Sequence, residues 1–160
     1  MKLYLLRHGD AADPLDPRYP TDELRPLTAK GIKRTRQLAN GLRQMEISFD
    51  VILSSPLVRA KQTAEIVARS LKLEKQLRFT NHLAPNGAYV DVIAQVENAR
   101  ATAKNVLLVG HEPLLSGLIS LLCSGGPLLG LTLKKGGLCR LEVATLKAGR
   151  CALLEWLLTP

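Results

Sequence analysis

The residues best suited to chemistry are Arg7-His8-Gly9, which directly follow a short apolar run at residues 3–6. An imidazole held at the end of a buried strand can act as a nucleophile. The guanidinium before it carries a permanent charge for phosphate oxygens, and the glycine after it lets other groups approach the backbone. This pattern favours attack on a phosphoryl group. The motif is short, however, so the hypothesis depends on what other segments supply.

Two further segments place phosphate-binding side chains at predicted strand ends. Residues 51–53 are followed by Ser54-Ser55-Pro56 and then Arg59, and residues 106–109 are followed by Gly110-His111-Glu112-Pro113. Ligands of parallel sheets collect outside the carboxyl ends of the strands. A side chain in a first helical turn leans back towards those ends, and the free N–H groups of a helix N-terminus favour an anion. Two arginines and two histidines are therefore expected at one rim.

Each of these side chains also has a simpler interpretation. Arg7 could be a surface charge at a strand end, Arg59 a partner of Glu65 or a solvated residue, and His111 a hydrogen-bonded loop histidine. Together the simpler interpretations are less favoured, because three strand ends each contribute a group that suits phosphate. His82 has no such companions, and we expect a structural or solvent-facing role for it.

Alternating strands and helices are expected to position these groups. Predicted strands cover residues 3–6, 51–53, 77–80 and 106–109. Predicted helices follow the cap Thr28 to about residue 44, open at Ser55-Pro56 and reach 71, and cover about 88–103 and 113–123. Residues 138–144 and 152–158 flank a turn at 147–149 and predict a hairpin. The pattern predicts an α/β fold, a three-layer αβα sandwich whose mostly parallel mixed sheet ends in an antiparallel hairpin.

Composition indicates one globular domain over residues 1–160, with 46% hydrophobic and 22% charged residues. The apolar stretches are too short to span a bilayer, and Arg7 falls where a secretory signal would be apolar. The three cysteines (Cys123, Cys139 and Cys151) lack metal-site spacing and indicate buried thiols in a reducing compartment, so we expect a cytoplasmic protein. Three histidines without an acidic cluster nearby predict no metal and no cofactor.

The net charge of +8 could suggest nucleic-acid binding, but aromatic residues make up only 4% of the chain and basic tails are missing. An anionic substrate or an acidic partner suits the charge equally well. Much of it falls in one predicted helix, on Lys30, Lys33, Arg34, Arg36 and Arg43. That helix presents either a solvated face or a docking surface for an acidic protein.

In their order along the chain, four groups of residues resemble the histidine phosphatase superfamily, the phosphoglycerate mutase-like proteins. They are Arg7-His8-Gly9, residues 26–31, residues 54–64 with Arg59-Ala60 and Gln62-Thr63-Ala64, and Gly110-His111-Glu112-Pro113. The short chain, residues 7–12 and residues 25–28 are most similar to the compact SixA-type branch, the protein phosphohistidine phosphatases.

The resemblance implies a metal-free phosphoryl transfer in two steps. His8 would be the nucleophile and become phosphohistidine, which water then hydrolyses. Arg7, Arg59 and His111 would hold the equatorial phosphate oxygens.

Two further contacts and one proton are implied as well. Ser54 and the backbone N–H of Glu112 are additional candidate phosphate contacts. The second ring nitrogen of His8 should donate to an acceptor in the backbone after Gly9. Asp10 and Glu112, next to the histidines, could orient an imidazole, move protons or cap local turns.

The predicted substrate follows from a missing carboxylate. Larger members of the superfamily carry an acidic residue in an inserted loop, whereas residues 81–87 are short and hold none. This absence favours a phosphohistidine on a signalling or phosphorelay protein, because imidazole leaves without strong acid assistance. Asp10 or His82 could still serve as a donor. The alternatives are a phosphatase or mutase for sugar, glycerate or nucleotide phosphates, and a non-catalytic phosphate-binding module.

Overall fold

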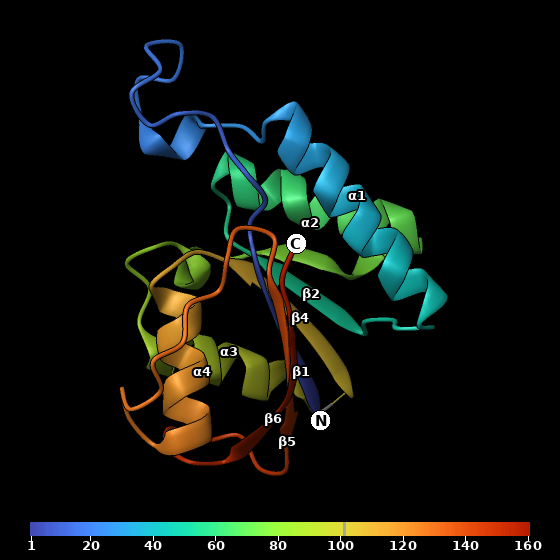
Figure 1. The fold of residues 1–160 in the computed structure, drawn as a ribbon. Coiled ribbons are helices and arrows are strands. Elements are labelled where there is room, and N and C mark those ends of the chain that lie inside the picture. Colours follow the sequence, from blue (N-terminus) through green and yellow to red (C-terminus); the bar gives the residue numbers. More distant parts are fainter. Residues whose placement is uncertain (101) are drawn as a thin grey trace.

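Six strands form one sheet at the centre of the molecule in the computed structural model, which describes residues 1–100 and 102–160 (Figure 1). The strands are β1 (Lys2–Arg7), β2 (Val51–Ser54), β3 (Leu77–Phe79), β4 (Asn105–Gly110), β5 (Leu138–Val143) and β6 (Ala152–Leu158). Their order is β3-β2-β4-β1-β5-β6. The first four run parallel, and β5 and β6 are antiparallel. The predicted mixed sheet and its terminal hairpin are confirmed.

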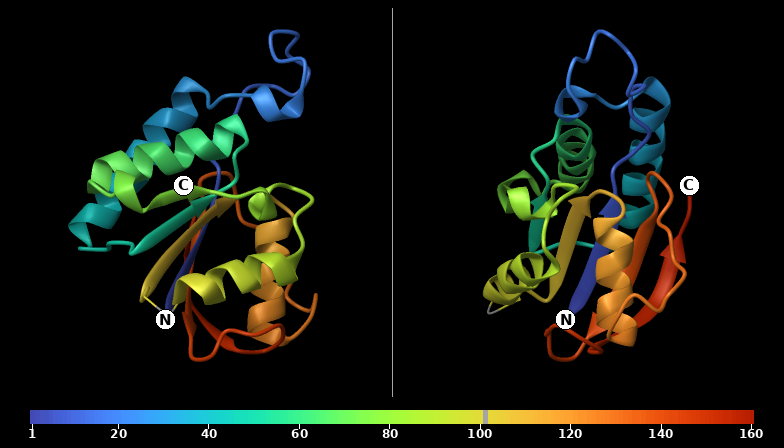
Figure 2. Two further views of the ribbon diagram at one scale, coloured as in Figure 1. Left: turned by 180° about the vertical axis from the view of Figure 1, so that it is seen from behind. Right: turned by 90° about the vertical axis from the view of Figure 1, so that its left-hand side faces the viewer.

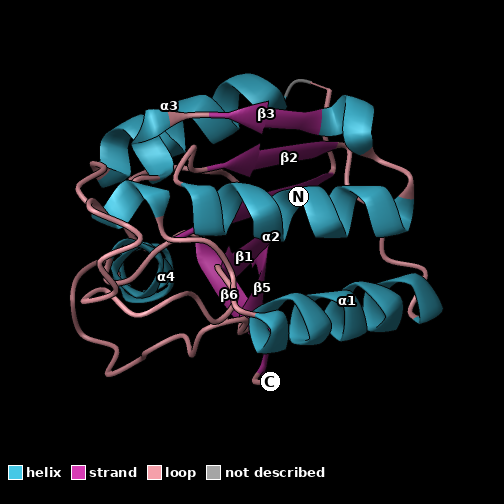
Figure 3. Cartoon of the chain, turned by 90° about the horizontal axis from the view of Figure 1, so that it is seen from above, coloured by secondary structure: helices cyan, strands magenta, loops and turns pink. Residues whose placement is uncertain are grey.

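Two pairs of helices cover the two faces of this sheet (Figures 1 and 2). They are α1 (Ala29–Gln44) with α2 (Val58–Leu71), and α3 (Tyr89–Arg100) with α4 (Leu114–Ser124). Alternate side chains of β1 enter two separate cores: Leu3 and Leu5 pack with α3 and α4, and Tyr4 and Leu6 pack with α1 and α2. The αβα sandwich is therefore confirmed. Figure 3 shows α1 and α2 side by side and α4 end-on.

Thr28 caps α1 as predicted, because its side chain accepts a hydrogen bond from the backbone N–H of Gly31 at 3.0 Å. The basic side chains predicted to lie on this helix, Lys30, Lys33, Arg34, Arg36 and Arg43, are exposed, whereas Thr35, Ala39 and Leu42 are buried. In the segments predicted as loops, single 3₁₀ turns occur at η1 (Asp22–Leu24), η2 (Glu74–Gln76) and η3 (Asn81–Leu83).

The predicted start of the second helix is wrong. Ser55 still donates its backbone N–H to the carbonyl of Val109 at 3.0 Å, which extends the strand pairing, and its hydroxyl accepts from Leu57 N–H at 3.3 Å. The helix therefore begins at Val58 and not at Ser55-Pro56. The helix predicted over 88–103 is observed as α3, and residue 101 lies outside the described residues.

Cys139 is buried, as predicted, but Cys123 and Cys151 are only half-buried, and the three thiols are free. Within the two described ranges, no helix combines the length and the apolar character needed to cross a membrane.

Candidate active site

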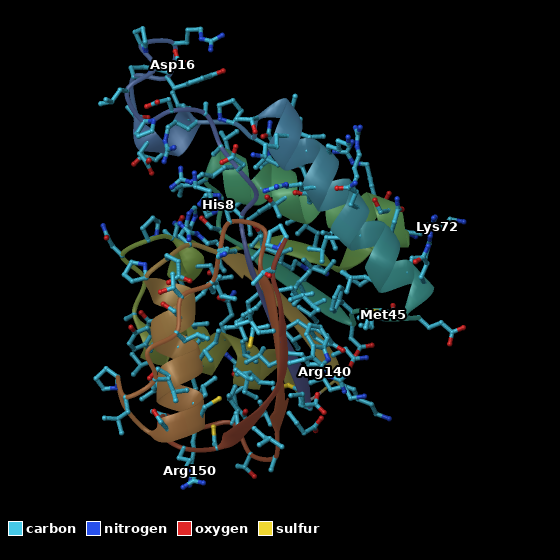
Figure 4. All side chains as sticks on the ribbon, viewed as in Figure 1. His8, Asp16, Met45, Lys72, Arg140 and Arg150 are labelled. Atoms are coloured by element: carbon cyan, nitrogen blue, oxygen red, sulfur yellow. The ribbon has the colours of Figure 1, made fainter. Side chains whose placement is uncertain are left out.

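Three neighbouring parallel strands end at one edge of the sheet, and their ends carry the side chains singled out in the sequence. The β1–β4 register sets Arg7 beside Gly110, and the β2–β4 register sets Ser54 beside Val109. The backbone N–H of His8 donates to the Gly110 carbonyl at 3.0 Å. The ring centroids of His8 and His111 are consequently 5.0 Å apart. Figure 4 shows His8 below the loop that carries Asp16.

His8 is held in one orientation and one protonation state. Its Nδ1 lies 2.7 Å from the carbonyl oxygen of Gly9, and a carbonyl only accepts, so this nitrogen carries the proton. The Nε–H of Arg59 points at the other ring nitrogen, Nε2, at 3.3 Å. Burial and the nearby charges of Arg59 and Arg7 lower the pKa of His8 to about 4, despite the Gly9 hydrogen bond. At neutral pH the ring is uncharged, with an unprotonated Nε2.

His111 is the second neutral imidazole at this edge. Its Nε2 lies 2.9 Å from the hydroxyl oxygen of Ser55, while its Nδ1 is buried and has no partner among the residues described. Burial lowers its pKa to about 3, and both a protonated His8 and the charge of Arg59 would act in the same direction. A buried ring nitrogen without a partner is uncommon and indicates a place for a ligand atom.

Arg59 is 3% exposed and lies against both His8 and the loop before α1. Its Nη1 donates to the backbone carbonyl of Asp22 and its Nη2 to Oδ2 of the same residue, each at 2.6 Å. The simpler interpretations of Arg59 are therefore wrong: it is not solvated, and Glu65 pairs instead with Arg69 at 3.4 Å.

Asp22 is one of the residues that the sequence interpretation missed, together with Ser55. Asp22 lies in a Pro-rich loop, where spacing carries no information about contacts with a helix far along the chain. The only available signal was an acidic side chain just before the Arg25-Pro26 segment at the opening of α1.

Arg7 is half-buried and reaches a segment that follows α4. Its Nη1 donates to the carbonyl of Leu133 at 2.7 Å, and its Nε is buried without a partner in the described part of the chain. Burial lowers the pKa of this guanidinium, although Glu112 opposes the shift. Like the free nitrogen of His111, this Nε–H is available to an anion.

Ser54 and Glu112 are engaged with their neighbours. The buried hydroxyl of Ser54 donates to the Ser55 carbonyl at 2.9 Å, and it is Ser55 that contacts His111. The Glu112 carboxylate accepts hydrogen bonds from the Ser116 hydroxyl and from the backbone N–H of Leu133. The carboxylate of Glu112 thus fixes local backbone.

Asp10 and His82 also have partners of their own. The hydroxyl of Thr28 donates to Asp10 Oδ2 at 3.1 Å, and Lys135 donates to Oδ1 at 3.2 Å. His82 is 49% exposed, and its Nδ1 lies 3.7 Å from a carboxylate oxygen of Asp91. The solvent-facing interpretation of His82 is confirmed.

Gly9 is required by close packing beside the nucleophile candidate. Its N–H donates to the hydroxyl of Thr63 in α2 at 3.1 Å. A Cβ at this position would lie 2.9 Å from Oγ1 of Thr35 in α1, which is closer than side chains tolerate. Both helices therefore fix the backbone that holds the His8 ring.

These contacts gather groups that could hold an anion around a nucleophilic ring nitrogen. A neutral Nε2 faces one guanidinium, and a second guanidinium and a neutral imidazole each offer an unpaired N–H or ring nitrogen. Over the described ranges, no three His, Cys, Asp or Glu side chains lie close enough together to hold a metal ion. The groups present suit a tetrahedral oxyanion such as phosphate.

Comparison with known proteins finds similarities in both sequence and fold. Residues 3–83 match the histidine phosphatase superfamily (branch 1). Over 127 residues, 78% of this chain, the sequence is 35% identical to phosphohistidine phosphatase SixA of Escherichia coli K12, of which 76% is covered. A probable phosphoglycerate mutase, GpmB, of E. coli is 30% identical over 118 residues, 71% of this chain and 54% of that protein. The protein histidine phosphatase SixA complexed with tungstate superposes with a TM-score of 0.86 at 28% identity, covering 99% of this chain and 97% of that chain.

Proposed function

The chain belongs to the histidine phosphatase superfamily, and on this premise we propose that it is a phosphohistidine phosphatase whose nucleophile is His8. The observation that carries the proposal is the state of the His8 ring. Its Nδ1 is tied to the Gly9 carbonyl at 2.7 Å, and its unprotonated Nε2 faces Arg59 at 3.3 Å. A nucleophile needs this free electron pair, held beside a positive charge that attracts phosphate.

In the first step, Nε2 of His8 attacks phosphorus in line with the bond that breaks. The leaving nitrogen of the substrate imidazole takes the electron pair of the P–N bond. It departs as neutral imidazole when its second nitrogen is already protonated. In the second step, a water molecule attacks the phosphoryl group on His8. The P–N bond electrons return to Nε2, and both hydrogens of the water leave with the phosphate.

Three side chains would hold the equatorial oxygens during both steps: Arg7, Arg59 and His111. The hydroxyl of Ser55 accepts from Leu57 N–H, so its own hydrogen can be donated to Nε2 of His111. The remaining proton of this neutral ring then sits on Nδ1, the atom without a partner, and can be donated to a phosphate oxygen. Arg7 offers its unpartnered Nε–H in the same way.

The two secondary contacts differ in their support. We keep the backbone N–H of Glu112 as a proposed phosphate contact because it follows His111 directly. We leave the Ser54 hydroxyl out, because its hydrogen is committed to the Ser55 carbonyl.

A phosphorylated protein is the proposed substrate. Asp10 is engaged by Thr28 and Lys135, and residues 81–87 contain no carboxylate, so the leaving group receives little acid assistance. A departing imidazole needs less assistance than an alkoxide. The related SixA of E. coli is named a phosphohistidine phosphatase. The free thiols suit the reducing cytoplasm, where we propose that it acts.

The basic face of α1 supplies a docking surface for such a protein in this proposal. A cavity of about 770 Å³ is lined by Arg7 and Gly9, which are the neighbours of His8 in sequence, although His8 is not part of the lining. Besides Arg7, its cationic lining consists of Lys30, Arg34, Lys134 and Lys135. The charge of this surface suits an acidic signalling domain better than a neutral one.

Small phosphate esters are the second candidate substrates, which the likeness to the E. coli mutase supports. A third possibility is a phosphate-binding module without activity.

Turnover by the purified protein separates these functions. The substrates are a histidine-phosphorylated acidic protein, free phosphohistidine, 3-phosphoglycerate and p-nitrophenyl phosphate, each with and without EDTA. His8→Asn should abolish turnover, whereas His82→Asn, which changes the exposed histidine, should retain it. Preference for the P–N substrates with no effect of EDTA supports the proposal. Preference for phosphoglycerate supports the second candidate, and binding without turnover supports the third.

A further inference from the structure

One carboxylate of the loop between β1 and α1, that of Asp22, contacts Arg59 in the site. Asp22 opens the short helix η1, and its carboxylate is half-exposed (49%), whereas its partner Arg59 is buried. Both terminal nitrogens of the guanidinium contact this one residue. Nη1 donates to the backbone carbonyl and Nη2 to Oδ2, each at 2.6 Å. No other side chain is hydrogen-bonded to the terminal nitrogens of Arg59 within the described residues.

A guanidinium offers two parallel pairs of N–H bonds, one formed by the terminal nitrogens and one formed by Nε with the inner hydrogen of Nη2. Asp22 takes the terminal pair. The Nε–H points at Nε2 of His8, at 3.3 Å, so the second pair faces the place where phosphorus must arrive. We propose that Asp22 is a positioning residue, which holds Arg59 so that its Nε edge is presented to the phosphoryl group beside His8. This inference rests on the proposed function.

Asp22 is itself held from the other side. Arg25 donates from Nε and Nη2 to Oδ1 of Asp22, at 2.9 and 2.5 Å, and from Nη1 to the carbonyl of Ala12 at 2.7 Å. Each oxygen of the Asp22 carboxylate therefore accepts hydrogen bonds from a different arginine. The contacts run without a break from the backbone after β1, through Arg25 and Asp22, to Arg59 and the His8 ring.

Two other roles for this carboxylate make different predictions. As a proton donor to the leaving group, Asp22 would have to be protonated. Burial raises its pKa, but the hydrogen bonds from Arg25 and Arg59 outweigh burial, so the pKa lies below the usual value and the group is ionised at neutral pH. As a plug, Asp22 would compete with phosphate for Arg59, but it occupies the terminal pair of N–H bonds and leaves the Nε edge directed at His8.

Kinetics of Asp22→Ala and Asp22→Asn test the proposal, with p-nitrophenyl phosphate and phenyl phosphate as substrates and vanadate as a phosphate mimic. The matched control is Asp16→Asn, which changes a half-buried aspartate of the same loop; among the described residues, the hydrogen-bond partner of its carboxylate is Arg18 of that loop (Figure 4). Misplacing a substrate-binding group by about 1 Å costs about a hundredfold in rate. We expect Asp22→Ala to lower kcat/KM by about ten- to a hundredfold, by the same factor for both leaving groups, and to weaken vanadate binding.

Asp22→Asn retains the backbone carbonyl contact and an amide oxygen, so its loss should be smaller. Arg25→Gln should reproduce part of the effect, and Asp16→Asn should leave both constants unchanged. Thermal unfolding checks that each variant is folded, and vanadate affinity still reports on Arg59 if aryl phosphates turn over slowly.

Three results would overturn the inference. If kcat/KM fell only for phenyl phosphate, whose phenolate is the poorer leaving group, Asp22 would be a proton donor. Tighter vanadate binding or faster turnover in Asp22→Asn would show that Asp22 competes with phosphate for Arg59. Unchanged kinetics in Asp22→Ala would show that Asp22 does not position Arg59. The proposed function is tested separately, by measuring the turnover of phosphohistidine by the wild-type protein and by His8→Asn.

Discussion

Acid should destabilise this protein because it buries two neutral imidazoles. Their pKa values, about 4 for His8 and about 3 for His111, lie below the usual 6.5 because burial disfavours the charged rings. When the pH falls below 6.5, the unfolded chain binds protons on these histidines and the folded chain does not. Protons therefore favour the unfolded state, and stability falls with pH in this window.

The size of the effect follows from the same values. At pH 5.5 an unfolded histidine is protonated about ten times out of eleven, which favours unfolding by about 1.4 kcal/mol per histidine. The two together cost about 3 kcal/mol relative to pH 7.5, whatever their folded pKa values, provided that both lie well below 5.5. The carboxyl groups of Asp10 and Asp22 have lowered pKa values, so their stabilising contribution is lost only at lower pH.

Urea unfolding at pH 7.5 and 5.5, in phosphate-free buffer, measures this difference. The wild-type protein should lose about 3 kcal/mol, and the double variant His8→Asn, His111→Asn should lose much less. His82→Asn serves as the control, because this exposed histidine should leave the loss unchanged. Equal stability of the wild-type protein at both pH values would refute the argument that the two rings are neutral and buried.

Three further predictions concern the groups around the nucleophile. Arg59→Lys should lower kcat/KM about a hundredfold or more, because an ammonium cannot bond Asp22 and phosphate along two edges; wild-type kinetics would contradict this. Gly9→Ala should destabilise the fold by about 1–3 kcal/mol, because its Cβ would meet the Thr35 hydroxyl; urea unfolding would show an unchanged midpoint if the contact were loose. Lys30→Glu should raise KM for a phosphoprotein but not for free phosphohistidine, whereas Arg36→Glu, outside the cavity lining, should change neither.

Much of the fold could be predicted because its strands and helices carry strong local patterns. The apolar runs at β1 and β4 are buried on both faces, as parallel strands require, and Thr28 caps α1 directly. The start of α2 could not be predicted, because a tertiary hydrogen bond from Ser55 to Val109 outweighs the preference of proline for a first helical position.

The same distinction applies to the site. His8, Arg59 and His111 could be placed together, because the ends of neighbouring parallel strands must meet at one edge. Asp22 could not be found, because its contacts depend on how an irregular loop folds back over α2. Ser55 was missed in favour of Ser54, because a one-residue difference at a strand end decides which hydroxyl reaches His111.

The central claim is that His8 carries the phosphoryl group between the two steps. Rapid mixing with a ³²P-labelled phosphohistidine protein, followed by an alkaline quench and peptide mapping, tests it most directly. The account predicts a transient, acid-labile label on His8 that disappears in His8→Asn and persists in His82→Asn. Turnover that continues while the label lies on another residue, or while His8→Asn retains full activity, would contradict it.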